Sequence, residues 1–139
     1  MSKIKLDEWF KELKVIYIQG SNSQDNYNKA VELVAEHGYD KFDEVKYIRH
    51  LWRCVTENTG ACIYNNFRDS HMKADEFVRF IDYNRHPLNV TYGSVMNNYN
   101  LIIITSVQKI NEIYPNQPYD PPERWLRRVT TIIDLYEAK

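Results

Sequence analysis

Four consecutive long aliphatic residues, Leu101 to Ile104, constrain the fold of this chain more than any other feature. A short apolar run of this kind is typical of a strand buried on both faces. The apolar residues around it, however, recur from Val95 to Ile113 at gaps of three and four, which is the spacing of a helical stripe. Ser94 supplies an N-cap, and Pro115 ends the pattern. We therefore predict a helix over 94–114, with a strand over 101–105 as the alternative.

The C-terminal segment carries the start signals of a helix. Asp120 is an N-cap residue, Pro121 occupies the first helical position, and Glu123 follows three residues after the cap. Apolar residues from Trp125 to Tyr136 then fall on one face. The pattern predicts a helix that occupies most of 120–139.

Helical spacing also extends over 25–38, 40–60 and 70–87. Residues 9–20 fit a helix slightly better than a strand that runs into the loop Gly20–Asp25. The sum predicts an all-α, single-domain bundle of five or six helices over 1–139. The alternative is an α/β fold with short strands at 14–19 and 101–105.

Length and composition restrict the class of protein. A chain of 139 residues fits one domain, and a formal net charge of −1 argues against a dedicated duplex-DNA binder. No stretch approaches the roughly 20 apolar residues that cross a bilayer, and the charged N-terminus has no signal-peptide core. Two cysteines are too few for a disulfide framework. We expect a cytoplasmic protein with reduced thiols and no membrane partner.

The segment Gly20–Asp25 precedes a helix, so its amides could bind an anion. The phosphate-binding version needs a preceding strand, further glycines and a lysine, and the lysine is absent. A cap and turn is the simpler interpretation.

Acidic residues offer a second candidate chemistry. Glu32 and Glu36 lie one helical turn apart and could share a divalent ion with Asp43 or Glu44, as in a small metal-dependent nucleotide hydrolase. Their positions opposite an apolar stripe and at a helix start equally fit solvated charges. His50 and Cys54 are four residues apart, a helical spacing at which two ligands can converge on zinc, and Cys62 and His71 could complete the set. No CxxC or HxxxH pair supports this site. We expect no catalytic residue, no metal and no cofactor.

Two blocks combine arginine with aromatic residues, Tyr47–Arg53 and Arg124–Arg128. Arginine binds phosphates and carboxylates through two parallel hydrogen bonds, and aromatic rings stack on bases. If the two predicted helices were adjacent, one face would bind nucleic acid or an acidic partner. The candidate residues are Arg49, Arg53, Arg124, Arg127 and Arg128.

Eleven tyrosines exceed what a core of this size requires. Tyrosine is enriched in protein interfaces, and four of these residues lie in or beside predicted loops: Tyr64, Tyr83, Tyr92 and Tyr119. We therefore expect first a non-catalytic protein that binds another protein, with self-association possible. An inhibitor or adaptor of phage or mobile-element type would suit a composition rich in Asn, Tyr, Ile and Lys. Nucleic-acid binding through the arginines is the alternative.

Overall fold

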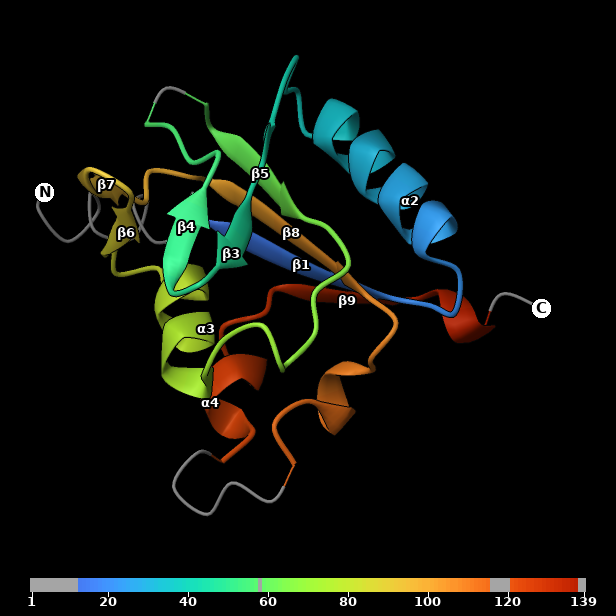
Figure 1. Cartoon of the computed structure of the whole chain (residues 1–139). Coiled ribbons are helices and arrows are strands. Elements are labelled where there is room, and N and C mark those ends of the chain that lie inside the picture. Colours follow the sequence, from blue (N-terminus) through green and yellow to red (C-terminus); the bar gives the residue numbers. More distant parts are fainter. Residues whose placement is uncertain (1–12, 58, 116–120, 138–139) are drawn as a thin grey trace, which may run out of the picture.

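The computed structural model describes residues 13–57, 59–115 and 121–137. It is an α/β fold built on a five-stranded sheet whose paired strands all run parallel (Figure 1). The strand order is β2-β5-β8-β1-β9. The strands are β1 (Lys14–Gln19), β2 (Asp43–Glu44), β5 (Ala61–Tyr64), β8 (Leu101–Ser106) and β9 (Thr131–Asp134).

The aliphatic tract lies at the centre of this sheet. Every residue of β8 is buried, and the strand pairs with β5 on one side and β1 on the other. A central parallel strand is covered on both faces, so it needs apolar side chains without alternation. The run Leu101–Ile104 has that composition.

Helices and hairpins cover the two faces of the sheet (Figure 1). Helix α2 (Ser23–Glu36) packs on one face through Ala30, Leu33 and Val34. The other face is covered by α3 (Ala74–Ile81), α4 (Glu123–Leu126) and two antiparallel hairpins. The hairpins are β3–β4 (Lys46–Ile48 and Leu51–Arg53) and β6–β7 (Pro87–Val90 and Gly93–Met96), and the 3₁₀ turns are η1 (Ile110–Glu112) and η2 (Leu135–Glu137).

The prediction of an all-α bundle is wrong, and the segment 94–114 shows why. It contains β7, β8 and η1 in place of one helix. Tyr99 and Ile113 are both buried, but Tyr99 precedes β8 and Ile113 follows η1, so they lie in separate segments that reach the same core. Their spacing therefore imitated a helical stripe without sharing a helix.

Three further predicted helices are corrected by the structure. Residues 14–19 form β1, so the strand alternative holds there. Within 40–60 the chain forms β2 and the β3–β4 hairpin, in which Tyr47 lies opposite Trp52. The C-terminal helix lasts only from Glu123 to Leu126, after which the chain pairs with β1 as β9.

The helices predicted near 25–38 and within 70–87 are confirmed as α2 and α3. The α/β alternative with strands at 14–19 and 101–105 is also confirmed. Among the residues that the structure describes, no helix has the length and apolarity needed to cross a membrane.

Candidate functional site

The carboxyl edge of the sheet gathers polar residues from three strands. Gly20 follows β1, Asn65 and Asn66 follow β5, and Ser106 ends β8. The Gly20 amide donates to the Ser106 carbonyl at 3.1 Å, and the Asn66 amide donates to Thr105 Oγ1 at 2.7 Å. Ligand sites of parallel α/β sheets lie at this edge.

The β1–α2 connection has the strand–loop–helix arrangement of a phosphate-binding loop. Counted from Gly20, however, Asp25 and Asn26 stand where the motif G-x-x-x-x-G-K-[ST] has its second glycine and its lysine. Tyr27 stands where the motif has the Ser or Thr whose side chain would contact magnesium. The loop therefore has the right topology without the groups that bind a nucleotide phosphate.

Asn26 is buried between the end of β1 and the end of β8. Its side chain is buried, and Nδ2 donates to the carbonyls of Gly20 at 3.0 Å and Ser106 at 3.3 Å. Asn26 Oδ1 would lie only 2.4 Å from a Cβ added to Gly20. The side chain thus links the end of β1 to the end of β8, and the loop has a structural role.

The β3–β4 hairpin carries an unusual concentration of positive charge. Lys46 lies directly opposite Arg53 in the register, and both side chains are exposed. Like charges at opposed positions destabilise a strand pair. Among the described residues neither cation forms an ion pair.

The turn of this hairpin adds a third cation in a strained backbone. Arg49 and His50 connect the strands, with φ angles of 55° and 69°. Two consecutive left-handed residues define a type I′ turn, for which Asn-Gly is the favoured pair. Side chains other than Gly, Asn and Asp pay about 1–2 kcal/mol each for this conformation. Such strain is concentrated at ligand-binding sites.

Two neighbouring cavities lie beneath the hairpin. The first has a volume of about 560 Å³ and is lined by Lys46, Tyr47, Arg49 and the residues that follow β5. The second, of about 740 Å³, extends to the start of α3 and is lined by Glu76 among others. Tyr47 and His71 are the residues that line both, so the cavities adjoin there. We call the two cavities together the hairpin groove.

Buried aromatic residues support Tyr47. Its ring lies 5.1 Å from that of Trp52, which stacks on Phe80 at 4.5 Å. Trp52 Nε1 donates to Glu76 Oε2 at 2.7 Å, so the indole is fixed to α3. Tyr47 itself is only half-buried, so part of its ring faces the groove while Trp52 supports it from behind.

His71, which lines both cavities, is held in a defined orientation. Its Nδ1 accepts from the Arg68 amide at 3.3 Å and lies 3.1 Å from the Tyr64 hydroxyl. Burial and the neighbouring Arg68 lower the pKa of His71, whereas Asp69 opposes that shift. The ring is therefore neutral at pH 7, with Nδ1 as acceptor and the proton on Nε2.

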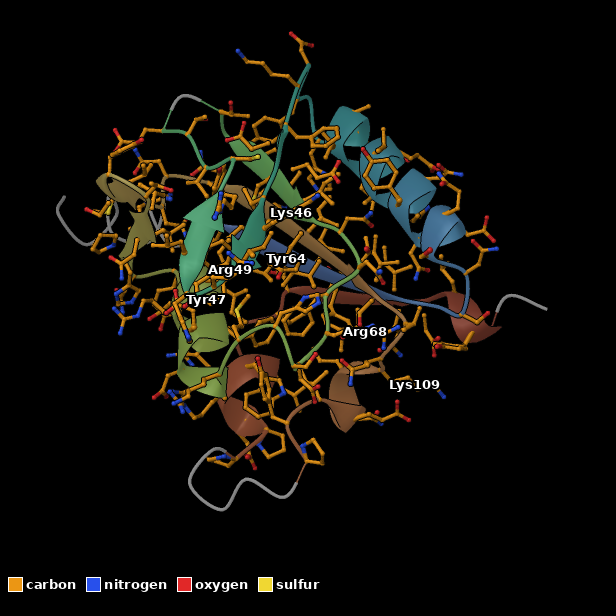
Figure 2. All side chains as sticks on the ribbon, in the orientation of Figure 1. Lys46, Tyr47, Arg49, Tyr64, Arg68 and Lys109 are labelled. Atoms are coloured by element: carbon orange, nitrogen blue, oxygen red, sulfur yellow. The ribbon has the colours of Figure 1, made fainter. Side chains whose placement is uncertain are left out.

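Positive charge continues from the groove along the edge of the sheet. Figure 2 shows Lys46 and Arg49 on the hairpin side, Tyr64 between, and Arg68 and Lys109 beyond it. The loop after β5 joins the segment after β8, because the Asp69 amide donates to Gln108 Oε1 at 2.8 Å. This contact places Arg68 and Lys109 on adjoining segments.

The predicted arginine candidates separate into two groups. Arg49 and Arg53 belong to the hairpin, and a hairpin replaces the predicted helix. Arg124 pairs with Asp75 of α3 at 2.9 Å, and Arg128 Nε lies 3.4 Å from an oxygen of Asp82. These two guanidinium groups fasten the C-terminal segment to α3, and Arg127 is exposed.

The predicted interface tyrosines that the structure describes differ in exposure. Tyr64 is only 3% exposed, and its hydroxyl contacts His71. Tyr83 is 46% exposed after α3, and Tyr92 is 98% exposed at the turn of the β6–β7 hairpin. Tyr119 lies outside the described residues.

The acidic candidates are mostly occupied by contacts within the chain. Glu32 pairs with Lys29 at 3.3 Å, and Glu44 accepts from the Tyr27 hydroxyl at 3.1 Å. Asp43 accepts from the Tyr99 hydroxyl at 2.6 Å. Within 13–57, 59–115 and 121–137, no group of three or more His, Cys, Asp or Glu could hold a metal ion. Both cysteines are free, with Cys54 exposed and Cys62 buried in β5.

Lys46 of the groove and the neighbouring cations Arg68 and Lys109 were missed from sequence, and His71 was considered only as a zinc ligand. They are far apart in the chain and are brought together by parallel strand pairing, which no local pattern reveals. One local signal was usable. Outward and inward residues of a strand alternate, and Lys46 and Ile48 are exposed on either side of the half-buried Tyr47.

Neither the protein-family models nor the curated proteins contain a match to this chain.

Proposed function

We propose that this protein binds single-stranded nucleic acid in the hairpin groove without catalysing a reaction on it. One observation carries the proposal. The β3–β4 hairpin presents Lys46, Arg49 and Arg53 to solvent without an ion-pair partner among the described residues. Cations that repel one another in the free protein are stabilised when phosphates lie between them.

A single strand suits the groove better than a duplex. Proteins that bind single strands combine a positive track for the backbone with aromatic rings that stack on exposed bases. Lys46 and Arg49 provide the track, and the supported ring of Tyr47 provides the stacking surface. The net charge of −1 is low for a duplex binder, whose affinity depends on many phosphate contacts.

The carboxyl edge of the sheet supports binding rather than phosphate hydrolysis. Asn26 occupies the position of the lysine that would contact the β- and γ-phosphates. Asn65 and Asn66 follow β5 with neutral amides, whereas magnesium at such sites is bound by a carboxylate.

The test is fluorescence anisotropy of a labelled 15-nucleotide single strand titrated with the protein at several salt concentrations. The variant Lys46→Glu/Arg49→Glu reverses two groove charges. We expect at least a hundredfold weaker binding, and the slope of log affinity against log salt should become shallower by about 1.4.

The control Lys14→Glu/Lys41→Glu changes the net charge equally at exposed positions outside the groove. It should retain most of the wild-type affinity. Equal losses in the two double variants would indicate nonspecific attraction, and no measurable wild-type binding at low salt would refute the proposal. A duplex of the same sequence should compete poorly; if it competes better than the single strand, the ligand class is wrong.

A protein partner is the second candidate, and the β6–β7 hairpin favours it. Tyr92 is 98% exposed at its turn, and Met96 is 39% exposed on β7. Exposed aromatic side chains of this kind anchor protein interfaces. An inhibitor or adaptor would use this hairpin, and Tyr92→Ala should abolish recovery of one stoichiometric partner in a pull-down while leaving oligonucleotide binding unchanged.

We also propose a cytoplasmic location, because the thiols of Cys54 and Cys62 are free and reduced thiols persist there.

A further inference from the structure

The two cavities of the hairpin groove differ in charge. The 560 Å³ cavity carries Lys46 and Arg49, and its one carboxylate, Glu44, already accepts from Tyr27. The 740 Å³ cavity carries more carboxylates than cations, and those carboxylates are Asp69, Asp75 and Glu76. Phosphate therefore fits the first cavity, whereas the second favours a neutral group with hydrogen-bond donors. A nucleotide unit has these two parts side by side.

Most carboxylate oxygens of the second cavity already have partners. Asp69 accepts from the Tyr114 amide at 2.9 Å and from Gln108 Nε2 at 3.3 Å. Asp75 pairs with Arg124. Glu76 uses only Oε2, for Trp52, and its Oε1 has no partner among the residues that the structure describes. Among the described residues, the only other oxygen of these carboxylates without a partner is Oδ2 of Asp75, whose side chain is 78% exposed, so we assign Glu76 Oε1 as the acceptor for a ligand.

Glu76 lies beside the stacking surface. Trp52 connects it to Tyr47 through one hydrogen bond and one ring contact. Burial, and next the charge of Glu76, raise the pKa of the Tyr47 phenol, which is consistent with this proximity. A base stacked on Tyr47 would thus lie within reach of a fixed carboxylate.

We propose that the second cavity holds one nucleobase stacked on Tyr47. The nucleobase donates a hydrogen bond from its exocyclic amino group to Glu76 Oε1 and accepts one from His71 Nε2–H. This inference rests on the proposed function and adds base selectivity to it. Carboxylates accept from the N4 amino group of cytosine. Thymine presents a carbonyl oxygen at that position, which the carboxylate would repel. The groove should therefore prefer cytosine to thymine.

The experiment compares labelled 15-nucleotide oligo-dC and oligo-dT by anisotropy at pH 8 and constant salt. The two strands share backbone charge and base size, so a difference reports the edge of the base. We expect oligo-dC to bind about tenfold more tightly, which corresponds to one good hydrogen-bonded contact. Equal affinities would overturn the base pocket and leave the proposed function standing. Failure of both strands to bind would instead reject the proposed function.

The variant Glu76→Gln tests the assigned acceptor. Its carbonyl can still accept from Trp52, and its amide then points a donor at the base. The preference for oligo-dC should disappear or reverse towards oligo-dT. The control Glu36→Gln, at an exposed position of α2, should keep the wild-type ratio. A ratio unchanged in Glu76→Gln would contradict the proposal.

Tyr47→Leu provides an independent test if Glu76→Gln does not fold. Leucine keeps an apolar contact with Trp52 but removes the stacking surface. Both oligonucleotides should bind between about five- and a hundredfold more weakly, the range for loss of one base–aromatic stack. Unchanged affinity in a variant with wild-type circular dichroism would overturn the proposal.

Discussion

The β1–α2 loop and the β3–β4 hairpin both lie near the carboxyl edge of the sheet, but they differ in how their polar groups are satisfied. In the loop, Asn26 fills the available space and bonds to Gly20 and Ser106. In the hairpin, Lys46 and Arg53 oppose each other and the turn backbone is strained. The loop is closely packed around Asn26, although the buried Asn26 Oδ1 has no hydrogen-bond partner among the described residues. The hairpin instead has features that a polyanion would stabilise. Close packing in the loop and exposed, unpaired cations on the hairpin, more than position in the fold, therefore distinguish the candidate binding surface.

The largest expected effect on stability comes from the loop. In Gly20→Ala the new Cβ would lie 2.4 Å from Asn26 Oδ1 and 2.9 Å from Leu135 Cβ. Both neighbours are held in place, so we expect a loss of about 3 kcal/mol in urea unfolding. The control Gly38→Ala meets no atom within 4 Å but has φ of 88°. It should lose only about 1 kcal/mol through backbone strain. Similar losses in both would show that the loop is not tightly packed.

The hairpin should respond in the opposite direction. Replacing the turn by Arg49→Asn/His50→Gly supplies the favoured type I′ pair and should stabilise the fold by about 1–2 kcal/mol. The same change removes a cation from the groove, so oligonucleotide affinity should fall severalfold. Cys54→Gly is the control, because Cys54 also has positive φ, at 65°, but does not line the groove. It should stabilise the fold without weakening binding. If the turn variant gains no stability, backbone strain does not distinguish the hairpin from the β1–α2 loop.

A smaller effect concerns pH. The pKa of His71 is lowered in the folded state by burial and Arg68, so below the unfolded value of about 6.5 the unfolded chain binds a proton that the native ring resists. Stability should therefore fall as the pH drops through 6.5, until it reaches the lower native pKa. In His71→Gln this part of the pH dependence should disappear from thermal melts recorded between pH 5 and 8. An unchanged profile would mean that His71 is not desolvated as the contacts imply.

The smallest expected effect is a null result at the loop. Magnesium-ATP at millimolar concentration should shift the melting temperature by less than about 1 °C, because a ligand stabilises only the state that binds it. A ligand at one hundred times its Kd would add about 2.7 kcal/mol, which such a melt detects readily. A clear upward shift with ATP would show that the loop binds phosphate despite Asn26. An oligo-dC of 15 nucleotides serves as the positive control.

Sequence patterns predicted some elements and missed others for physical reasons. Helices α2 and α3 were predictable because each keeps its apolar residues within one continuous element. The central strand was not, since Leu101–Ile104 is apolar in both interpretations and only the pairing with β1 and β5 decides between them. Local charge identified Arg49, which lines the groove, and Arg53, which lies on β4 of the same hairpin. Their relation to His71 and Lys109 depends on contacts between distant segments and could not be read locally.

The two free thiols occupy contrasting depths of the molecule. Cys54 is exposed after the hairpin, whereas Cys62 is wholly buried in β5, where burial raises the pKa of its thiol. A thiol reagent should therefore modify Cys54 at the rate of a free cysteine, and Cys62 only as fast as the strands separate. Counting one added mass and then two by mass spectrometry would time the opening of the central sheet, with or without bound oligonucleotide, in a protein that needs no engineered label.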